Sequence, residues 1–197
     1  MKVLALELSS PRGSIAFREA GKTCIVREFP ADRKHSGLFY ENLSALHESC
    51  GAPDLIVVGL GPGSYAGSRI AIATALGLKA ASGAAIVGLP SICAFDCAEY
   101  CAIGDARRNS FFFAHVIDGH CVEGPSLGTT TEVQAKLDEW PQLPVLASQP
   151  LPQFQNATLA YPSAMVLAEL AEKLDSRTEE PLEPIYLREP YITTPNK

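Results

Sequence analysis

The chain has 197 residues, of which 47% are hydrophobic and 19% are charged. A polypeptide of this length and composition buries a substantial core, which excludes a disordered or fibrous protein. It carries 16 basic and 22 acidic residues, and the formal charge of -6 has the wrong sign for neutralising a phosphate backbone. We therefore expect any contact with nucleic acid to be made through a partner.

The first half of the chain alternates strand and helix signals. Apolar side chains recur at three- and four-residue spacing over residues 36–50, with Ser36 as the candidate N-cap and Gly51 as the stop. The continuous apolar run at residues 54–60 is typical of a strand covered on both faces. In chain order the predicted elements are strands at 2–8, 14–17 and 23–29, a helix at 36–50, a strand at 54–60, a helix at 64–81, a strand at 85–88 and a helix from about Pro90.

The second half gives weaker signals. Residues 105–117 predict a turn followed by a strand that contains three consecutive phenylalanines. Thr131 and Gln134 have the spacing of a capping box, which predicts a helix that ends at the single tryptophan. Residues 162–174 predict an amphipathic helix, and the proline-punctuated tail from Glu179 onward is expected to be extended.

This order of elements is an α/β pattern with a mixed sheet. We place a domain boundary near residues 100–104, which divides the chain into an amino-terminal lobe of residues 1–100 and a smaller carboxyl-terminal lobe of residues 101–197. The apolar span at 70–89 has Lys79 near its middle, so a buried helix followed by a strand fits it better than a membrane span.

The cysteines and the amino terminus predict the compartment. The six cysteines contain no Cys-x-x-Cys pair, and the first apolar run is broken by Glu7 and too short for a signal peptide. Both features are typical of reduced thiols, so we predict a cytoplasmic protein without a membrane partner. Cys93, Cys97 and Cys101 are expected on one helix face, where core packing is favoured over a metal that would need a fourth ligand.

A glycine-rich segment is the most distinctive local motif. Gly61, Pro62, Gly63, Ser64, Tyr65, Ala66 and Gly67 lie between a predicted buried strand and a predicted helix, where backbone N–H groups and the helix dipole suit an anion. As a dinucleotide fingerprint the segment is weak, because Pro62 removes a donor and no acidic residue ends the next strand. The glycines equally suit a tight turn with close packing, so both alternatives stay open.

The helix after this loop carries small residues at four-residue spacing. Two neighbouring tracks are formed by Gly67, Ala71 and Ala75 and by Ala73, Gly77 and Ala81. Another backbone can approach such a stripe closely, and that backbone belongs either to the core or to a docking subunit.

Three further sets of polar residues contain side chains of the types that take part in catalysis or ligand binding. Glu7 ends the first strand, where a carboxylate holds a cation, activates water or merely caps the strand. Asp105-Ala106-Arg107-Arg108 binds an anion or forms an ion-paired turn. The four histidines show no compact ligand spacing, and we expect no metal site.

Five segments in order resemble one family over nearly the whole chain. They are LALELSS near the start, His35-Ser36 before the first helix, GPGSYAGSRI after the fourth strand, DARRNSFFFA in mid-chain and PIYLREPYI near the end. Together they resemble the TsaB family, the glycoprotease-like bacterial subunit of tRNA threonylcarbamoyladenosine (t6A) biosynthesis formerly called YeaZ. The glycine loop, GPGSFTGLR in the family, is the most specific segment.

The resemblance implies an actin-like ATPase (ASKHA) fold of two ribonuclease-H-like lobes with mixed sheets, the second lobe short. It implies a non-catalytic scaffold without cofactor, which activates a homologous catalytic threonylcarbamoyltransferase subunit (TsaD-type). That subunit modifies N6 of adenosine 37 in tRNAs reading ANN codons. A small ATPase of the same pathway (TsaE-type) completes the assembly, and tRNA is reached through the complex.

In the family the first two helices form the pairing surface, which here means residues 36–50 and 64–81. The candidate interface residues on them are Leu38, Leu43, Leu46, Tyr65, Arg69, Ile70, Ala73, Thr74 and Gly77. An exposed apolar docking face also tends to self-associate, so the chain alone can form a homodimer through these helices.

The chain departs from the family pattern at several positions. Leu8 and Ala66 replace threonines, which removes hydroxyls that a nucleotide phosphate uses, and Glu7 replaces an aspartate. The alternative function is an ATP-binding enzyme of the actin-like fold, a kinase or hydrolase that uses Glu7 and the glycine loop. A metallopeptidase, suggested by the older family name, lacks the paired helical histidines.

Overall fold

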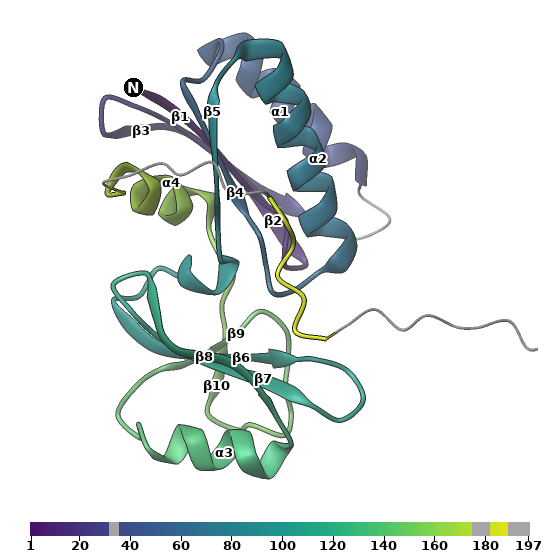
Figure 1. The fold of residues 1–197 in the computed structure, drawn as a ribbon, viewed down its shortest axis with the longest axis vertical. Helices are drawn as coiled ribbons and strands as arrows, with labels where there is room; N and C mark the ends of the chain where they lie inside the picture. Colours follow the sequence, from purple (N-terminus) through teal and green to yellow (C-terminus); the bar gives the residue numbers. More distant parts are fainter. Residues whose placement is uncertain (32–35, 175–181, 189–197) are drawn as a thin grey trace, which may run out of the picture.

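The computed structural model describes residues 1–31, 36–174 and 182–188. Within these residues the chain forms two five-stranded sheets, each at the centre of one lobe, and the two lobes are stacked along the long axis of the molecule (Figure 1). The expected helix at 36–50 and the expected strands and helix between residues 54 and 89 are present, with ends that differ by one or two residues.

The first lobe begins with three strands that form an antiparallel meander. Its elements are β1 (Lys2–Glu7), β2 (Arg12–Glu19), β3 (Lys22–Pro30), α1 (Ser36–Cys50), β4 (Leu55–Gly59), α2 (Tyr65–Ser82) and β5 (Ala85–Leu89). The sheet order is β3-β2-β1-β4-β5, in which β1, β4 and β5 are parallel. Every residue of β4 is buried, as the continuous apolar run at its position predicts.

The second lobe repeats this strand order. After the short helix η1 (Ser91–Cys93) come β6 (Glu99–Asp105), β7 (Phe111–Ile117), β8 (His120–Gly128), α3 (Thr130–Asp138), β9 (Val145–Ala147) and β10 (Ala157–Leu159). The sheet order is β10-β9-β6-β7-β8, with β6, β7 and β8 antiparallel and β6, β9 and β10 parallel. Each lobe therefore has a three-stranded meander whose first strand is joined by two parallel strands.

The last helix, α4 (Ala164–Glu172), returns to the first lobe and packs on the face of its sheet opposite α1 and α2 (Figure 1). Alternate residues of β1 serve the two faces, since Leu4 and Leu6 pack with α1 and α2 while Val3 and Ala5 pack with α4. The division expected near residues 100–104 falls inside β6, and α4 belongs to the first lobe although it follows that division.

Two sequence expectations in the middle of the chain are wrong. The helix expected from Pro90 is limited to η1, and Cys101 lies in β6 rather than on a helix face with Cys93 and Cys97. β6 pairs with β7 on one side and β9 on the other, and this pairing outweighs the local helical spacing. The capping box of α3 is formed by Thr129 and Glu132, two residues before the expected pair.

Two further expectations concern the tail and the membrane. Of the tail from residue 179, residues 182–188 are described and contain neither helix nor strand; the remainder lies outside the described residues, as does His35. No helix in the described ranges is long and apolar enough to cross a bilayer.

The ends of α1 differ slightly from the expected caps. Ser36, the candidate N-cap, is the first residue of α1, and Gly51 follows the helix with φ +73°.

Candidate functional site: the cleft between the lobes

A cleft of about 810 Å³ lies between the two lobes. Its first-lobe wall is formed by residues 8–11, which follow β1, and by residues 62–68 of the glycine loop and the start of α2. Its second-lobe wall includes residues 104–107 at the end of β6, and residues 184–188 of the carboxyl-terminal segment complete it. The sequence motifs at Glu7, the glycine loop and Asp105 therefore meet at one place in the fold.

Glu7 itself is sealed away from solvent. Its side chain is 0% exposed, Oε1 accepts a hydrogen bond from Ser9 N at 2.6 Å, and Oε2 accepts one from Ser91 Oγ at 2.7 Å. Burial raises the pKa of the Glu7 carboxyl above its ordinary value, although the hydrogen bonds from Ser9 and Ser91 favour the charged form. Glu7 is not among the residues that line the cleft. Its carboxyl group instead holds Ser9, which does line the cleft, and Ser91 by hydrogen bonds.

The base of the glycine loop is built around this carboxyl group. A Cβ atom at Gly59 would lie 1.8 Å from Glu7 Oε2, which leaves no room for a side chain. Gly61 N donates to Ser91 Oγ at 2.9 Å, and Ser91 N donates to Gly61 O at 2.7 Å. Glu7, Ser91 and the start of the loop thus form one hydrogen-bonded unit.

The rest of the loop packs directly on the turn after β1. A Cβ atom at Gly63 would lie 2.2 Å from Ser9 O, and one at Gly67 would lie 1.9 Å from Leu8 O. Ser64 caps α2 by accepting a hydrogen bond from Gly67 N, while Ser64 N donates to Ser9 O at 2.6 Å. The geometry therefore favours close packing as the role of Gly63 and Gly67. The Ser64 N–H already donates a hydrogen bond to the Ser9 carbonyl oxygen.

Aromatic and basic side chains gather at the mouth of the cleft. The rings of Tyr65 and Tyr186 lie 5.4 Å apart at 31°, and the Arg69 guanidinium lies 5.1 Å from the centre of the Tyr65 ring. Tyr65 and Tyr186 are 56% and 46% exposed, and Arg69 donates a hydrogen bond to the Tyr65 hydroxyl. The carboxyl-terminal segment is held here because Ile185 N donates to Leu60 O at 2.8 Å.

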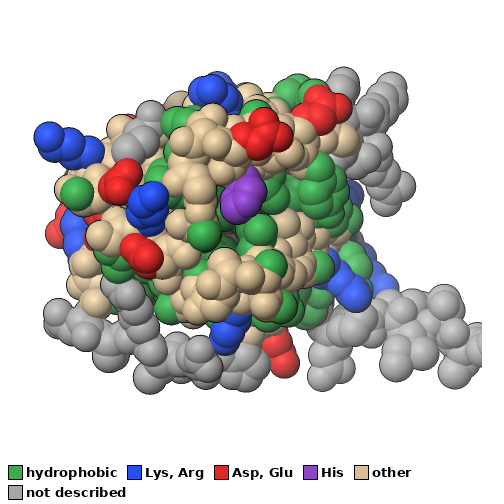
Figure 2. Space-filling model, turned by 90° about the horizontal axis from the view of Figure 1, so that it is seen from above, with side chains coloured by type: hydrophobic (Ala, Val, Ile, Leu, Met, Phe, Trp, Pro, Cys, Tyr) green, Lys and Arg blue, Asp and Glu red, His purple; other side chains and the backbone are tan. Residues whose placement is uncertain are grey.

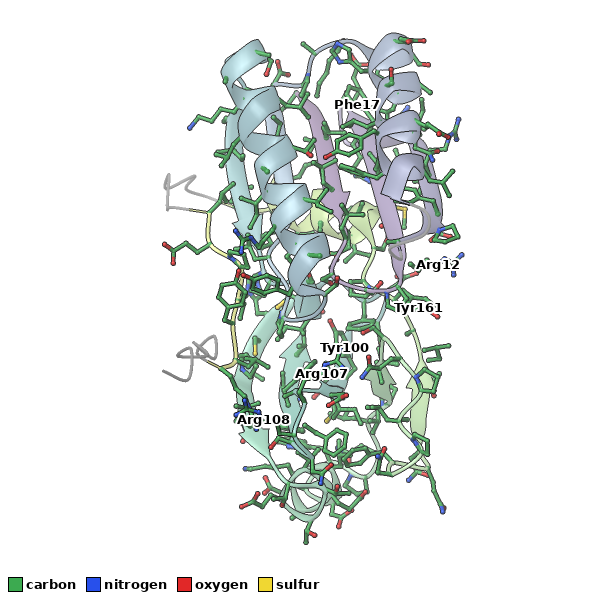
Figure 3. The ribbon with its side chains drawn as sticks, turned by 90° about the vertical axis from the view of Figure 1, so that its right-hand side faces the viewer. Arg12, Phe17, Tyr100, Arg107, Arg108 and Tyr161 are labelled. Carbon is green, nitrogen blue, oxygen red and sulfur yellow. The ribbon has the colours of Figure 1, made fainter. Side chains whose placement is uncertain are left out.

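The turn between β6 and β7 faces this cluster from the second lobe. Asp105 Oδ1 accepts from Arg107 N at 2.6 Å, and Arg107 O accepts from Ser110 N at 3.1 Å. Arg107, Arg108 and Asn109 have φ values of +67°, +55° and +55°. Figure 3 shows Arg107 just below the lower end of α2, with Arg108 beyond it. The Asp105 carboxylate thus binds the turn backbone.

The structure separates the candidate interface residues into three groups, which are buried, half-buried and exposed. Leu43 and Leu46 are 8% and 3% exposed and pack in the core of the first lobe, so their side chains are not available to a partner. Leu38 and Ile70 are half-buried at the edge of that core, and Thr74 is half-buried as well. The exposed members are Tyr65, Arg69, Ala73 and Gly77.

The small-residue stripe of α2 divides in the same way. Ala71 and Ala75 are fully buried against the sheet, whereas Ala73, Gly77 and Ala81 are exposed. A Cβ atom at Gly77 would meet nothing within 4 Å. One track of the stripe therefore belongs to the core, and the other is an open surface on the described part of the chain.

Two residues of the site were not expected from the sequence. Ser91 is fully buried and lies 84 positions from Glu7, so no local sequence pattern predicts the hydrogen bond between them. Tyr186 stands in the segment PIYLREPYI that carries the family resemblance, but its stacking on Tyr65 depends on the fold. Within residues 1–31, 36–174 and 182–188, no cluster of three or more His, Cys, Asp or Glu side chains is arranged to hold a metal.

Comparison with known sequences gives distant relatives. No family model matches the chain. An uncharacterized protein of Mycobacterium tuberculosis is 30% identical over 144 residues, which cover 70% of this chain and 65% of that protein. An uncharacterized protein of Mycobacterium leprae is 35% identical over 83 residues, covering 41% of this chain and 23% of that protein. The chain thus spans less than two thirds of the length of these relatives.

Two solved structures share the fold. A Pseudomonas aeruginosa protein described as similar to the peptidase YeaZ superposes with a TM-score of 0.75 at 22% identity, covering 95% of this chain and 99% of that one. YeaZ from Pseudomonas aeruginosa superposes with a TM-score of 0.69 at 20% identity, covering 87% and 90%. The likeness at such identities concerns the fold. The expected class, α/β with two lobes built on mixed sheets, is confirmed.

Proposed function

We propose that this chain is a non-catalytic, TsaB-like scaffold of the complex that makes t6A at position 37 of tRNAs reading ANN codons. Its expected partners are a homologous catalytic subunit of the TsaD type and a small ATPase of the TsaE type. The fold shared with YeaZ and the ordered sequence motifs support this assignment at the level of the family.

The observation that carries the proposal is the contrast between the sealed Glu7 carboxyl group and the open outer face of α2. Both oxygens of Glu7 accept protein hydrogen bonds, and the Ser64 N–H at the start of α2 donates to Ser9 O rather than to an open anion site. On the other side of α2, Ala73 and Gly77 form an exposed surface of small residues. Binding of a subunit needs such a surface, whereas catalysis by Glu7 needs an accessible carboxyl group.

In this proposal the chain acts by binding alone. A catalytic subunit docked on the outer face of α2 is stabilised in the conformation that fits this surface, so the free energy of association shifts its population toward the active state. Small side chains allow a partner helix to approach α2 closely, which increases the packing contacts per residue. The same face supports a homodimer when the catalytic subunit is absent.

The proposal is tested by a reconstituted transfer assay on tRNA with the catalytic subunit and the ATPase, with and without this chain. We expect modification to depend on the chain and no activity from the chain alone. Ala73→Leu should weaken association with the catalytic subunit by at least about tenfold, because a bulky group separates the packed backbones. Ala135→Leu, at an exposed position of α3, is the matched control and should bind as wild type does. Full modification without the chain would overturn the proposal.

The alternative function, an ATP-binding enzyme, is favoured by the volume of the cleft and by Arg107 on its wall. Calorimetric titration of the chain with ATP distinguishes the two functions. The scaffold predicts no heat of binding above dilution. Measurable ATP affinity that is lost on Glu7→Ala, in a variant with a native circular-dichroism spectrum, would replace the scaffold with the enzyme.

A further inference from the structure

Two tyrosines and three arginines form a cluster at the mouth of the cleft. Tyr65 and Arg69 come from α2, Arg107 comes from the β6–β7 turn, and Tyr186 and Arg188 come from the carboxyl-terminal segment. We call these residues the cleft-mouth cluster. Four of them line the cleft, and Arg69 lies over the ring of Tyr65.

The aromatic part of the cluster is already ordered. Tyr65 and Tyr186 stack on one another, and Arg69 is held against Tyr65 by both the ring contact and the hydrogen bond to its hydroxyl. About half of each tyrosine nevertheless remains open to solvent, at 56% and 46%. Both tyrosines therefore offer exposed ring surface to a planar group.

Arg107 of the cluster stands on a turn with a constrained backbone. Arg107 is exposed, and its guanidinium makes no hydrogen bond or ion pair with a residue that the structure describes. A left-handed conformation is unfavourable for an arginine, yet the turn keeps φ at +67°, because Arg107 N donates to Asp105 Oδ1 and Arg107 O accepts from Ser110 N. Arg188 donates a hydrogen bond to Ser110 Oγ, which places the second guanidinium on the same turn.

The charge around the cluster differs from that of the whole chain. Three arginines belong to the cluster, and Arg108 follows Arg107 on the same turn, whereas Asp105 is the one acidic residue among the described residues that line the cleft. Elsewhere the charges are mixed, as on the far end of the first lobe, where acidic, basic and apolar side chains are interspersed (Figure 2). A net charge of -6 therefore coexists with a positive cleft mouth.

We propose that the cleft-mouth cluster binds a single-stranded segment of RNA, with one base stacked on Tyr186 and phosphates held by Arg107 and Arg188. Stacked aromatics beside arginines are the usual surface for unpaired nucleotides, because every base has a π-face and the guanidinium pairs with phosphate. The inference rests on the proposed function for the identity of the RNA, a tRNA loop, but the binding belongs to this chain alone. It changes the expectation that nucleic acid is met only through partners.

Fluorescence anisotropy of the isolated full chain tests this inference. The probe is a labelled single-stranded RNA of about 12 nucleotides, titrated at low and moderate salt. Tyr186→Ala should weaken binding roughly tenfold, the loss expected for one stacked base. Arg107→Ala should also lower the slope of log affinity against log salt by about 0.7, the change expected for one phosphate contact on a single strand.

Matched controls are available on the same lobe. Tyr40→Ala removes a tyrosine that is 54% exposed on α1, and Arg27→Ala removes an exposed arginine of β3. Both should bind the RNA as wild type does, and all variants should keep the wild-type melting temperature within a few degrees. Equal binding by wild type, Tyr186→Ala and Arg107→Ala would overturn the inference.

Two other outcomes would also overturn it. If ATP alone binds as tightly as the RNA, the cluster is a mononucleotide site. If Tyr186→Ala loses the catalytic subunit but keeps RNA affinity, the cluster is a protein contact. The proposed function stands or fails separately, because it is measured by the dependence of tRNA modification on this chain.

Discussion

The two sheets have the same strand order but different surroundings. The first sheet is covered by α1 and α2 on one face and by α4 on the other, whereas α3 covers one face of the second and the connection around η1 covers the opposite face. The connection between β4 and β5 is the helix α2, while that between β9 and β10, at residues 148–156, is irregular. One topology therefore supports an exposed helix in one lobe and an irregular connection in the other.

The first strands of the two sheets show what this difference does to chemistry. β1 ends at Glu7 and β6 ends at Asp105, and each carboxylate accepts a hydrogen bond from the backbone N–H two residues later, at 2.6 Å in both cases. Ser91 and the glycine loop close over Glu7, but Asp105 remains exposed on the wall of the cleft. Topology places the acid, and the packing around it decides whether solvent reaches it.

The largest effect is expected from a substitution that disrupts the close packing of the glycine loop in the first lobe. Gly67→Ala places a Cβ atom 1.9 Å from Leu8 O, a backbone atom that moves only with the turn. We expect the free energy of unfolding to fall by about 3 kcal/mol, measured by urea denaturation. Gly77→Ala, in open space on the same helix, should instead stabilise by about 0.5–1 kcal/mol through helix propensity. A Gly67→Ala variant as stable as wild type would show that the loop is not held by this packing.

The second effect concerns the extra helix that covers the first sheet. Arg18, largely buried, donates to Glu169 at 2.9 Å and to Glu172 at 3.1 Å on α4, and also to Thr23 Oγ1 and Gly21 O. Arg18→Met should cost about 2 kcal/mol, because it leaves half-buried acceptors without a donor.

The control for Arg18 is an ion pair on the same strand. Arg12 is bonded to Glu28, and both side chains are about half exposed. Arg12→Met should therefore cost less than about 0.5 kcal/mol in the same urea titration. Equal losses in the two variants would mean that α4 is held by its apolar face alone.

The third effect sharpens the comparison between the two strand-end acids. Burial raises the pKa of Glu7 above its ordinary value of 4.5, so the folded state keeps this proton to higher pH than the unfolded state does. Stability due to this group is fully present below pH 4.5 and falls as pH rises toward the folded pKa, by at most about 1.4 kcal/mol per pH unit. Glu7→Gln should remove that fall, as measured by urea unfolding at a series of pH values.

Asp105→Asn is the matched variant at the equivalent strand end. It leaves Glu7 in place, and it should therefore keep the wild-type dependence of stability on pH. A Glu7→Gln variant with an unchanged pH profile would show that the buried carboxyl group does not titrate differently in the folded state.

The elements that could be predicted are those specified by neighbouring residues. α1 has the predicted bounds because apolar spacing within residues 36–50 and Gly51 at its end act locally. β4 is recognisable because both of its faces are buried, which produces an uninterrupted apolar run. Such signals belong mainly to the first lobe, where α1 and α2 are longer than α3, and the parallel strands β4 and β5 are longer than β9 and β10.

The second lobe was predicted less well because its strands depend on distant partners. β8 contains Gly124 and Pro125 and alternates between exposed and half-buried residues, and its pairing with β7 defines it. Pro90 suits the first turn of a helix, and the four-residue spacing of three cysteines is compatible with one, but Cys101 lies in β6, where that spacing has no meaning.

The site shows the same limit. Glu7, the glycine loop and the Asp105 turn were found because each stands at a strand end in the sequence. Ser91 and Tyr186 were missed, since the contacts that give them a role join segments far apart in the chain.

The smallest effect is expected at the N-terminal cap of α3, which lies two residues before the position that the sequence predicts. Thr129 Oγ1 accepts a hydrogen bond from Glu132 N, and Glu132 Oε2 accepts one from Thr129 N at 2.7 Å. Thr129→Ala should cost about 1 kcal/mol. Thr131→Ala, at the residue suggested by local spacing, should change stability by less than about 0.5 kcal/mol because that side chain is exposed within the helix.

Native-state hydrogen exchange separates a local effect from a global one. α3 contributes Val133 and Leu137 to the core of the second lobe, and its loss would expose the face of β7 beneath it. Faster exchange confined to α3, β7 and β8 in Thr129→Ala would show that this lobe opens independently of the first. Equal acceleration in β1 and β4 would show that the two sheets unfold as one unit, because the first sheet would then depend on a cap that it does not touch.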